Sequence, residues 1–322
     1  MNFLNSRDGR RALIRVHFIF PPGLCRLVAG WRNSLRLFAG VLVVALLLPA
    51  CGAIKIAYNQ APDVLYWYFD GYADFTDAQS LQIKADLARL QSWHRQTQLP
   101  GYAQFLQDAQ RQVQGDISPS QACMIFADAR RKLLTMYERA EPSVALLAVS
   151  LDASQLQHME RRFAKGNAEY RDDFLEGTPE ALHKRRLKKA LSRAETLYGR
   201  LDDRQMAMLA RMIEQSSFDA ARTYAERLRR QQDALTTFRQ LLPAPAADKA
   251  VKAAKAVNGL MERSATSPDA SYRGYAEKLT ADNCKSFSEL HNATTTAQRS
   301  KAAATLNDYE KDARALAAQS GG

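Results

Sequence analysis

The sequence has 322 residues, 46% hydrophobic and 25% charged, which is typical of a globular protein and excludes a disordered chain or a protein with many membrane spans. Glycine and proline are scarce, with 15 and 11 residues, and this favours helices over strands. Of the net charge of +11, residues 1–50 carry +6, which leaves +5 for residues 51–322. The basic whole-chain composition is therefore weak evidence for binding to nucleic acid.

An uncharged segment of 18 residues, 37–54, lies near the N-terminus. It is just long enough to span a bilayer, but its densest apolar part, 37–48, has the length of a signal-peptide core. It ends in LPAC at 48–51, which resembles the lipobox of bacterial lipoproteins. The resemblance implies cleavage before Cys51, a diacylglyceryl thioether on its sulfur and a fatty-acyl chain, such as palmitate, on the new N-terminus. An uncleaved anchor helix and a buried core segment are the alternatives.

The residue after Cys51 is Gly52 and not Asp, so the inner-membrane retention signal of many lipoproteins is missing. We therefore expect the outer membrane of a Gram-negative bacterium, on its periplasmic face, with the inner membrane as the less favoured site. Residues 1–50 are predicted to be a signal peptide. Their first thirty residues are long and polar for such a segment, and translation from near Val28 would give a compact one.

After Cys51, a helix-start pattern recurs five times: an apolar residue, a Thr, Ser or Asp, two free positions and an amide. The side-chain oxygen can accept from the first free N–H groups, and the amide can reach back to the backbone. The fold predicted is all-α, an array or bundle of about eight to ten helices with short capped connections. The instances are Phe75-Thr76-Asp77-Ala78-Gln79, Ile117-Ser118-Pro119-Ser120-Gln121, Leu151-Asp152-Ala153-Ser154-Gln155, Leu201-Asp202-Asp203-Arg204-Gln205 and Leu279-Thr280-Ala281-Asp282-Asn283.

Apolar residues three and four apart predict one long helix over 209–242. Turn-forming residues predict breaks between helices at 98–101, 115–118, Pro142, 177–179, 199–202, 243–248 and 264–269. We expect residues 51–322 to form a single periplasmic domain, with a candidate hinge near 243–248 that is too short to separate two domains.

Four cysteines are present, of which Cys25 lies in the predicted signal peptide and Cys51 at the lipidation site. Cys123 and Cys284 remain as an even pair in an oxidising compartment, which predicts a disulfide between them. Two buried free thiols are the alternative. A metal site is not expected, because two cysteines without a nearby pair of histidines do not complete a coordination shell.

Catalytic and cofactor motifs are not found in the sequence. The five histidines are scattered, at His17, His94, His158, His183 and His291, and no zinc-protease motif, nucleophile elbow or phosphate loop is present. We predict no catalytic residue, cofactor or metal ligand, and interpret His94 as a packed or capping histidine. An enzyme acting on peptidoglycan stays an alternative, since a pair of catalytic carboxylates cannot be recognised without the geometry of a pocket.

Two clusters of side chains are candidates for binding. The aromatic run LYWYFDGYADF at 65–75 follows the anchor closely, and its rings could rest at a lipid interface or form the core face of the first helix. The basic run at 183–189 could contact anionic headgroups, lipopolysaccharide phosphates or an acidic protein, or it could be a solvated helix face. Nucleic acid is disfavoured as a partner by the predicted compartment. The charges of the basic run are Lys184, Arg185, Arg186, Lys188 and Lys189.

Several longer motifs occur together: CGAIKIAYNQAP, YWYFDGY, SWHRQTQLPGY, KGNAEYRDDF and NCKSFSELHNATTTAQR. With the lipobox, they make the chain resemble a family of helical lipoproteins of Gram-negative bacteria that is grouped only as a domain of unknown function. The resemblance covers about 51–315 and implies a lipidated Cys51 and paired Cys123 and Cys284. It implies no activity. A weaker resemblance, through the L-T-x-x-Q pattern, is to small periplasmic helical chaperones.

The function predicted is that of a non-enzymatic structural or interaction module, tethered by its lipid to the outer membrane. Its expected partners are the membrane and an envelope protein, an anionic lipid or lipopolysaccharide. A chaperone-like periplasmic binding protein is the alternative, and a peptidoglycan hydrolase is less favoured.

Overall fold

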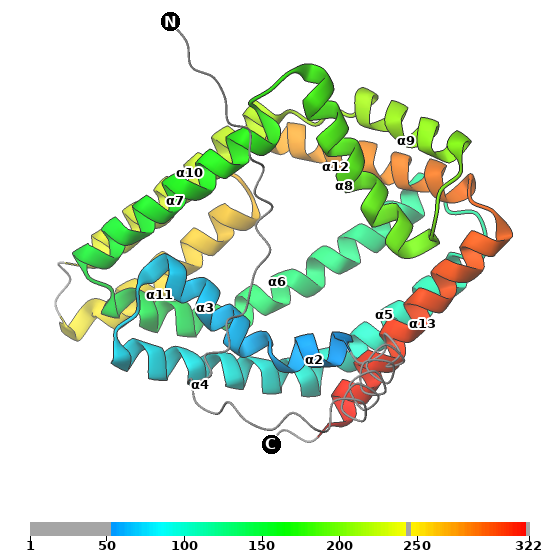
Figure 1. Ribbon diagram of the computed structural model, residues 1–322. Coiled ribbons are helices and arrows are strands. Elements are labelled where there is room, and N and C mark those ends of the chain that lie inside the picture. The colour runs from blue at the N-terminus through cyan, green and yellow to red at the C-terminus, as the bar shows by residue number, and fades with distance from the viewer. Residues whose placement is uncertain (1–52, 243–245, 320–322) are drawn as a thin grey trace, which may run out of the picture. The chain divides into compact units, whose positions relative to one another are not determined.

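The computed structural model describes residues 53–242 and 246–319, and every regular element within them is a helix (Figure 1). The predicted all-α class is confirmed. The first helices are α2 (Ala53–Asn59), α3 (Ala61–Ala73), α4 (Asp77–Trp93), a π-helical turn (His94–Gln98), α5 (Leu99–Gln112) and α6 (Pro119–Ser150). They are followed by α7 (Ala153–Phe174), α8 (Pro179–Tyr198), α9 (Asp203–Gln215), α10 (Ala220–Leu241), α11 (Ala246–Ala265), α12 (Ala270–Asn292) and α13 (Thr296–Ala318).

Four of the five predicted helix starts are confirmed as complete capping boxes, at Thr76, Ser118, Asp152 and Asp202. In each, the side-chain oxygen accepts from the N–H of the glutamine three residues later, and the glutamine side chain accepts from the N–H of the cap. The fifth predicted start is wrong. Thr280 lies inside α12, where its hydroxyl donates to the carbonyl of Ala276 at 2.8 Å, and the helix is capped by Asp269.

A capping box that was not predicted begins α13, at Thr295 with Gln298. It is paired with the box of α9, because the amide of Gln205 donates to Gln298 Oε1 at 2.7 Å and the amide of Gln298 donates back to Gln205 Oε1 at 2.9 Å. The boxes of α4 and α7 are paired in the same way, through Gln79 and Gln155 at 3.2 and 2.7 Å. The L-T-x-x-Q pattern thus joins helix starts to one another.

Each paired glutamine also donates to a carbonyl two residues before the opposite cap. Gln79 reaches the carbonyl of Ser150, and Gln155 that of Asp74. In the other pair, Gln205 reaches the carbonyl of Ala293 and Gln298 that of Arg200. Because each amide is satisfied on both sides, these polar groups can be buried at the junctions of four helices without the cost of an unpaired donor.

Three other boundary predictions are corrected. Pro142 lies inside α6, which continues to Ser150, so this proline does not end the helix. The segment 98–101 is not a break, since the π-helical turn joins α4 directly to α5. The predicted long helix over 209–242 is divided into α9 and α10, where Asp219 accepts from the N–H of Arg222 as a new N-cap. Its apolar periodicity continued across the break and concealed it.

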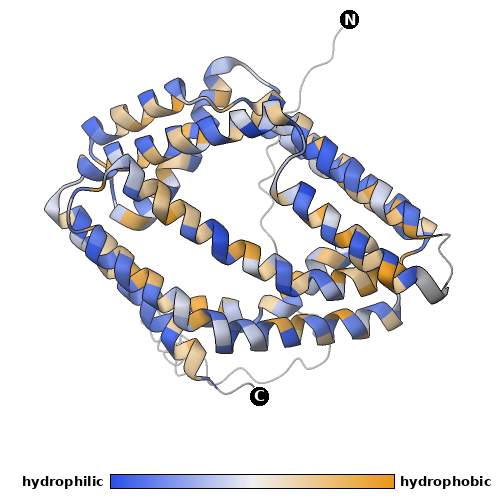
Figure 2. Ribbon diagram, turned by 180° about the vertical axis from the view of Figure 1, so that it is seen from behind, coloured by the Kyte–Doolittle hydropathy of each residue, from blue (hydrophilic) through white to orange (hydrophobic). Residues whose placement is uncertain are grey.

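The helices pack as successive neighbours and as long-range pairs (Figure 1). α13 lies along α5, α11 and α12 both pack on α6, and α7 lies beside α10 and α3. Since α11 also packs on α10, helices on both sides of the candidate hinge contact each other; residues 243–245 themselves lie outside the described part. Figure 2 shows hydrophobic and hydrophilic residues interleaved along the helices, as expected when each buries one stripe.

Buried apolar residues gather in several clusters. One surrounds Ile117, Tyr198, Leu201 and Cys284, where α6, α8, α9 and α12 meet. A second contains Ala73, Leu151, Leu156, Met159 and Leu235, and a third contains Ala145, Ala148, Leu241, Ala253 and Val257. The second and third both involve the last turns of α6 and α10, so these two helices connect them.

Cys123 and Cys284 form a disulfide in the structure, with their Cα atoms 5.2 Å apart. The bond joins the second turn of α6 to the middle of α12, across 161 residues of sequence. Cys284 is fully buried in the first cluster, so the bridge is part of the core and not a surface clasp.

Candidate functional site

The predicted lipidation site, Cys51, and the whole predicted signal peptide lie outside the described residues. Within the described residues, no helix is long and apolar enough to cross a membrane. In the same part of the chain, no group of three or more His, Cys, Asp or Glu side chains is placed to hold a metal ion.

The basic run lies on α8, and three of its five charges are engaged by the protein itself. Arg185 donates to the backbone carbonyls of Asp172 and Glu176, and Arg186 lies over the ring of Phe218 at 4.9 Å. Burial lowers the pKa of Arg186.

Lys189 is the third engaged charge of the basic run. It pairs with Asp173 at 2.9 Å and lies over Phe174 at 4.2 Å. Lys184 and Lys188 are exposed and take no part in these contacts. The run therefore fastens α8 to the end of α7, and only two of its charges are available to an anionic partner.

The aromatic run lies on α3, where its side chains separate onto different sides. Tyr66 faces α4 and donates to Ser80 Oγ at 2.9 Å, and Tyr72 packs on Phe163 of α7 at 5.6 Å. Trp67 is 67% exposed, and Tyr68 and Phe69 are also exposed. A helix that is apolar on most sides yet largely solvent-accessible is unusual in a soluble domain, and it indicates a surface with a function.

Two cavities lie against the aromatic run. The first, of about 530 Å³, is bounded by α3, α4 and α6 and reaches Met159 of α7 and Phe238 of α10. Its walls are mostly aliphatic and aromatic, with charges only from Asp86, Arg89 and Arg139. The volume lies within the range of about 300–1,000 Å³ that is usual for small-molecule sites.

The second cavity, of about 700 Å³, is more open and more polar. Five tyrosines contribute to it, together with Glu226, Arg227 and Arg230 of α10. Phe69, Tyr72 and Met159 line both cavities, so the two are neighbours separated by these side chains. Of the residues involved, only the aromatic run was predicted as a binding candidate. The five tyrosines of the second cavity are Tyr68, Tyr72, Tyr137, Tyr170 and Tyr272.

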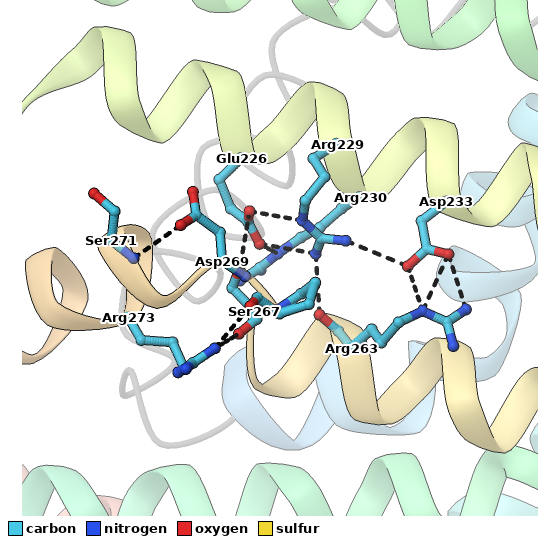
Figure 3. A network of polar contacts seen from close by, with 10 residues as sticks. Glu226, Arg229, Arg230, Asp233, Arg263, Ser267, Asp269, Ser271 and Arg273 are labelled. Carbon is cyan, nitrogen blue, oxygen red and sulfur yellow. Dashed lines mark hydrogen bonds and ion pairs between the residues drawn. The ribbon is translucent and has the colours of Figure 1, made fainter.

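Glu226 and Arg230 line the second cavity and belong to a network of ion pairs, which Figure 3 shows. The Glu226 carboxylate is buried and accepts hydrogen bonds from Arg229, Arg230 and Ser267 at 2.8 to 3.0 Å. Burial alone raises the pKa of Glu226, but these hydrogen bonds outweigh it and lower the pKa to about 2. The carboxylate is therefore ionised and fully engaged, which suits a structural role.

A second ion pair continues the network. Asp233 accepts three hydrogen bonds from Arg263 of α11, at 2.8 to 3.2 Å, and Arg229 bridges it to Glu226. Hydrogen bonds from Arg263 lower the pKa of Asp233. Together these contacts fix α11 to α10, as Figure 3 shows.

Two of the histidines, His94 and His291, are packed inside the fold, whereas His158 is partly exposed, with its Nε2 3.2 Å from the carbonyl oxygen of Gly71. His94 lies in the π-helical turn, where its Nδ1 is 3.0 Å from the Tyr58 hydroxyl and its ring contacts Tyr102, and burial lowers its pKa. His291 is completely buried between the Tyr198 hydroxyl, at 2.9 Å, and the carbonyl of Gly115, at 2.8 Å. Both rings are held by the fold and do not approach a carboxylate pair.

The residues that sequence reasoning missed lie on α6. Arg139, Pro142 and Leu146 line the first cavity, at intervals of three and four residues that place them on one face of the helix. Pro142 was interpreted as a break, and this hid the continuous helix that carries them. The apolar sequence 144-VALLAV-149 was the signal available.

Comparison with known proteins gives one match. Neither the curated proteins nor the solved structures contain a match to the chain. A family model, described as a family of unknown function (DUF6279), matches residues 71–248, a narrower range than the 51–315 over which the sequence resemblance was drawn. The matched range runs from the end of α3 to the start of α11 and covers most of the walls of both cavities. Because it includes more than half of the chain, the protein belongs to the DUF6279 family of unknown function.

Proposed function

We propose that the protein is an exported, lipid-anchored envelope protein that acts as a non-enzymatic structural or interaction module at the periplasmic face of the outer membrane. The observation that carries the proposal is the twelve-residue apolar run at 37–48 followed by LPAC at 48–51. The disulfide between Cys123 and Cys284 supports export, since such bonds persist in oxidising compartments and are rare in the cytosol.

The first helices after Cys51 support a position at the membrane surface. α2 begins two residues after this cysteine, and its Ile56 is 66% exposed. On α3, Val64 and Trp67 are exposed, lie three residues apart and line neither cavity. Exposed apolar side chains beside a lipidated N-terminus would enter the headgroup region, where tryptophan is favoured.

The cavities favour binding over hydrolysis. Hydrolysis of a glycan by the common mechanism needs two carboxyl groups facing each other across the substrate. In the described part of the chain, each of the two cavities is lined by a single carboxylate, Asp86 in the first and Glu226 in the second. Both are ion-paired with neighbouring arginines, Asp86 with Arg89 and Glu226 with Arg229 and Arg230.

The anchor is tested by Cys51→Ser in the full-length chain. We expect the wild-type protein to incorporate labelled palmitate and to co-sediment with outer-membrane fractions, and the variant to do neither. Cys25→Ser is the matched control, because this cysteine precedes the expected cleavage site. Equal labelling of wild type and Cys51→Ser would contradict the proposal.

The interaction module is tested by crosslinking in intact cells, followed by purification of the protein with whatever is attached to it. We expect to recover an envelope partner. If no partner is recovered above background, the result counts against an interaction module.

A chaperone-like function is the second candidate. Exposed hydrophobic side chains around the cavities favour it, among them Leu65, Phe69, Tyr137 and Leu146. The L-T-x-x-Q pattern does not, since its glutamines are occupied in capping helix starts and, in two pairs, in joining them. This candidate predicts that the protein suppresses aggregation of an unfolded client at near-stoichiometric ratio. If aggregation is not suppressed, the chaperone-like function is excluded, and the proposal of a lipid anchor is unaffected.

A further inference from the structure

We propose that the first cavity is a binding site for a single fatty-acyl chain with an anionic head, carboxylate or phosphate. The proposal concerns the folded domain and does not depend on whether Cys51 is lipidated. Three features carry it: the length of the cavity wall along α6, apolar walls that the protein's own side chains leave exposed, and a guanidinium group at one end.

The cavity is a slot between two antiparallel helices. The start of α4 lies at the end of α6, where Gln79 donates to the carbonyl of Ser150 at 2.9 Å. The end of α4 lies beside the middle of α6, where Arg139 covers the ring of Trp93 at 5.6 Å. The wall formed by α6 runs from Arg139 to Ala148, which is about 14 Å at the rise of an α-helix. Such a slot suits an extended chain better than a compact ligand.

The walls of the slot are apolar, and several of the side chains that form them are exposed to solvent. Leu65 and Phe69 of α3 and Leu146 of α6 line the slot, and all three are exposed. The far end is closed by the buried cluster that contains Leu151 and Met159. A hydrophobic ligand would therefore remove from water apolar surface that the fold leaves accessible.

The near end of the slot carries positive charge. Asp86, Arg89 and Arg139 are its charged lining residues, and Asp86 is neutralised by its ion pair with Arg89. In the described part of the chain, Arg139 contacts the Trp93 ring and no carboxylate. A guanidinium group held on an indole beside an apolar slot presents donors suited to a carboxylate or phosphate head.

The test uses the full chain carrying Cys51→Ser, so that no covalent acyl chain can enter the slot, held in an amphipathic polymer in place of detergent. Calorimetric titration compares octanoate, decanoate and laurate. We expect the affinity to rise by up to about fourfold with each added methylene, because each is removed from water. Affinity that does not change with chain length would overturn the proposal.

A matched pair of substitutions on α6 tests the location. Leu146 and Leu133 are 54% and 53% exposed, but only Leu146 lines the slot. We expect Leu146→Trp to obstruct the slot and weaken laurate binding at least tenfold, and Leu133→Trp to leave it unchanged. Both side chains are exposed, so both variants should fold, which circular dichroism checks. Equal affinities in the two variants would overturn the site.

A second pair of substitutions tests whether Arg139 binds the anionic head group of the ligand. Arg139→Gln should weaken laurate binding about tenfold, the value of one charge-assisted contact, and leave dodecanol binding nearly unchanged. Arg131→Gln, on the same helix outside the slot, should affect neither ligand. Lauroyl lysophosphatidic acid tests phosphate as the head, and binding of either anionic ligand supports the proposal. Equal effects of the two arginine substitutions on laurate binding would overturn the proposal. It would also be overturned if the protein bound a denatured protein but neither of the two anionic lipids.

Discussion

The buried carboxylate of Glu226 shows how one residue can hold two helices together. Its pKa, about 2 in the folded protein, lies below the ordinary 4.5, so folding favours the ionised form. The stabilisation this provides is complete above about pH 4.5 and is lost as the pH falls from there towards about 2. The difference between the two pKa values corresponds to about 3 kcal/mol of folding free energy.

We therefore expect Glu226→Gln to lower the free energy of unfolding by about 3 kcal/mol at pH 7, because Arg229 and Arg230 lose their buried partner. The difference from wild type should shrink steadily between pH 4.5 and 2. Urea unfolding at a series of pH values measures it. Glu214→Gln, at an exposed position on α9, should cost less than about 0.5 kcal/mol. Parallel pH profiles for wild type and Glu226→Gln would contradict the assignment.

Single residues of this kind could not be predicted from the sequence. Glu226 is one of 34 acidic residues, and its neighbours Arg229 and Arg230 have the spacing of an ordinary solvated pair. What distinguishes it is Ser267, which reaches the carboxylate from the end of α11, a contact between residues 41 positions apart. Burial of a charge depends on such long-range packing, which local patterns do not contain.

At the scale of the helix, local chemistry predicted much more. Four of the helix starts follow from capping residues within three positions of each other, and the structure contains all four. The errors arose where packing overrides propensity. Thr280 has the residues of a cap but donates within α12, and Pro142 is retained inside α6. The break at Ser216–Asp219 falls in a periodic apolar pattern that gives no local sign of it.

The paired boxes lead to a prediction about glutamine. Gln205 is almost fully buried and caps its own helix while bonding Gln298 and the carbonyl of Ala293. We expect Gln205→Ala to cost about 2–3 kcal/mol, because three polar groups lose a partner away from water. Gln121→Ala is the control, since this exposed glutamine serves its own box, and it should cost at most about 1 kcal/mol. If urea unfolding gives similar losses of stability for Gln205→Ala and Gln121→Ala, the pairing of the capping boxes contributes little to stability.

The proline inside α6 leads to the prediction of a substitution that stabilises the protein. Pro142 cannot donate to the carbonyl four residues earlier, and proline within a helix costs about 3 kcal/mol relative to alanine. Part of this is offset, by about 1 kcal/mol, because proline restricts the unfolded chain. Pro142→Ala should therefore raise the free energy of unfolding by about 2 kcal/mol. Pro119→Ala, at the first position of the same helix, should not stabilise the protein. Destabilisation by Pro142→Ala would show that the fold depends on the proline.

At the scale of the whole domain, the sequence predicted the helical class and proposed the pairing of Cys123 with Cys284, but not the cavities. Their walls come from α3, α4, α6, α7, α10 and α12, which are distant in sequence. The aromatic run could be recognised as a candidate because its residues are consecutive. Arg139 and Leu146 could not, because their role depends on which face of α6 meets α4, and the spacing of apolar residues on α6 does not determine this.

The disulfide provides the last prediction. It closes a loop of 161 residues, and on the chain-entropy model the loss of such a constraint costs about 5 kcal/mol. We expect the double variant Cys123→Ser/Cys284→Ser to be less stable by about this amount in urea unfolding under oxidising conditions. A reducing agent should lower the stability of wild type to that of the double variant and should not affect the variant further. Wild-type unfolding that is insensitive to reductant would mean that the thiols are free. It would also remove the support that the bond gives to an oxidising compartment.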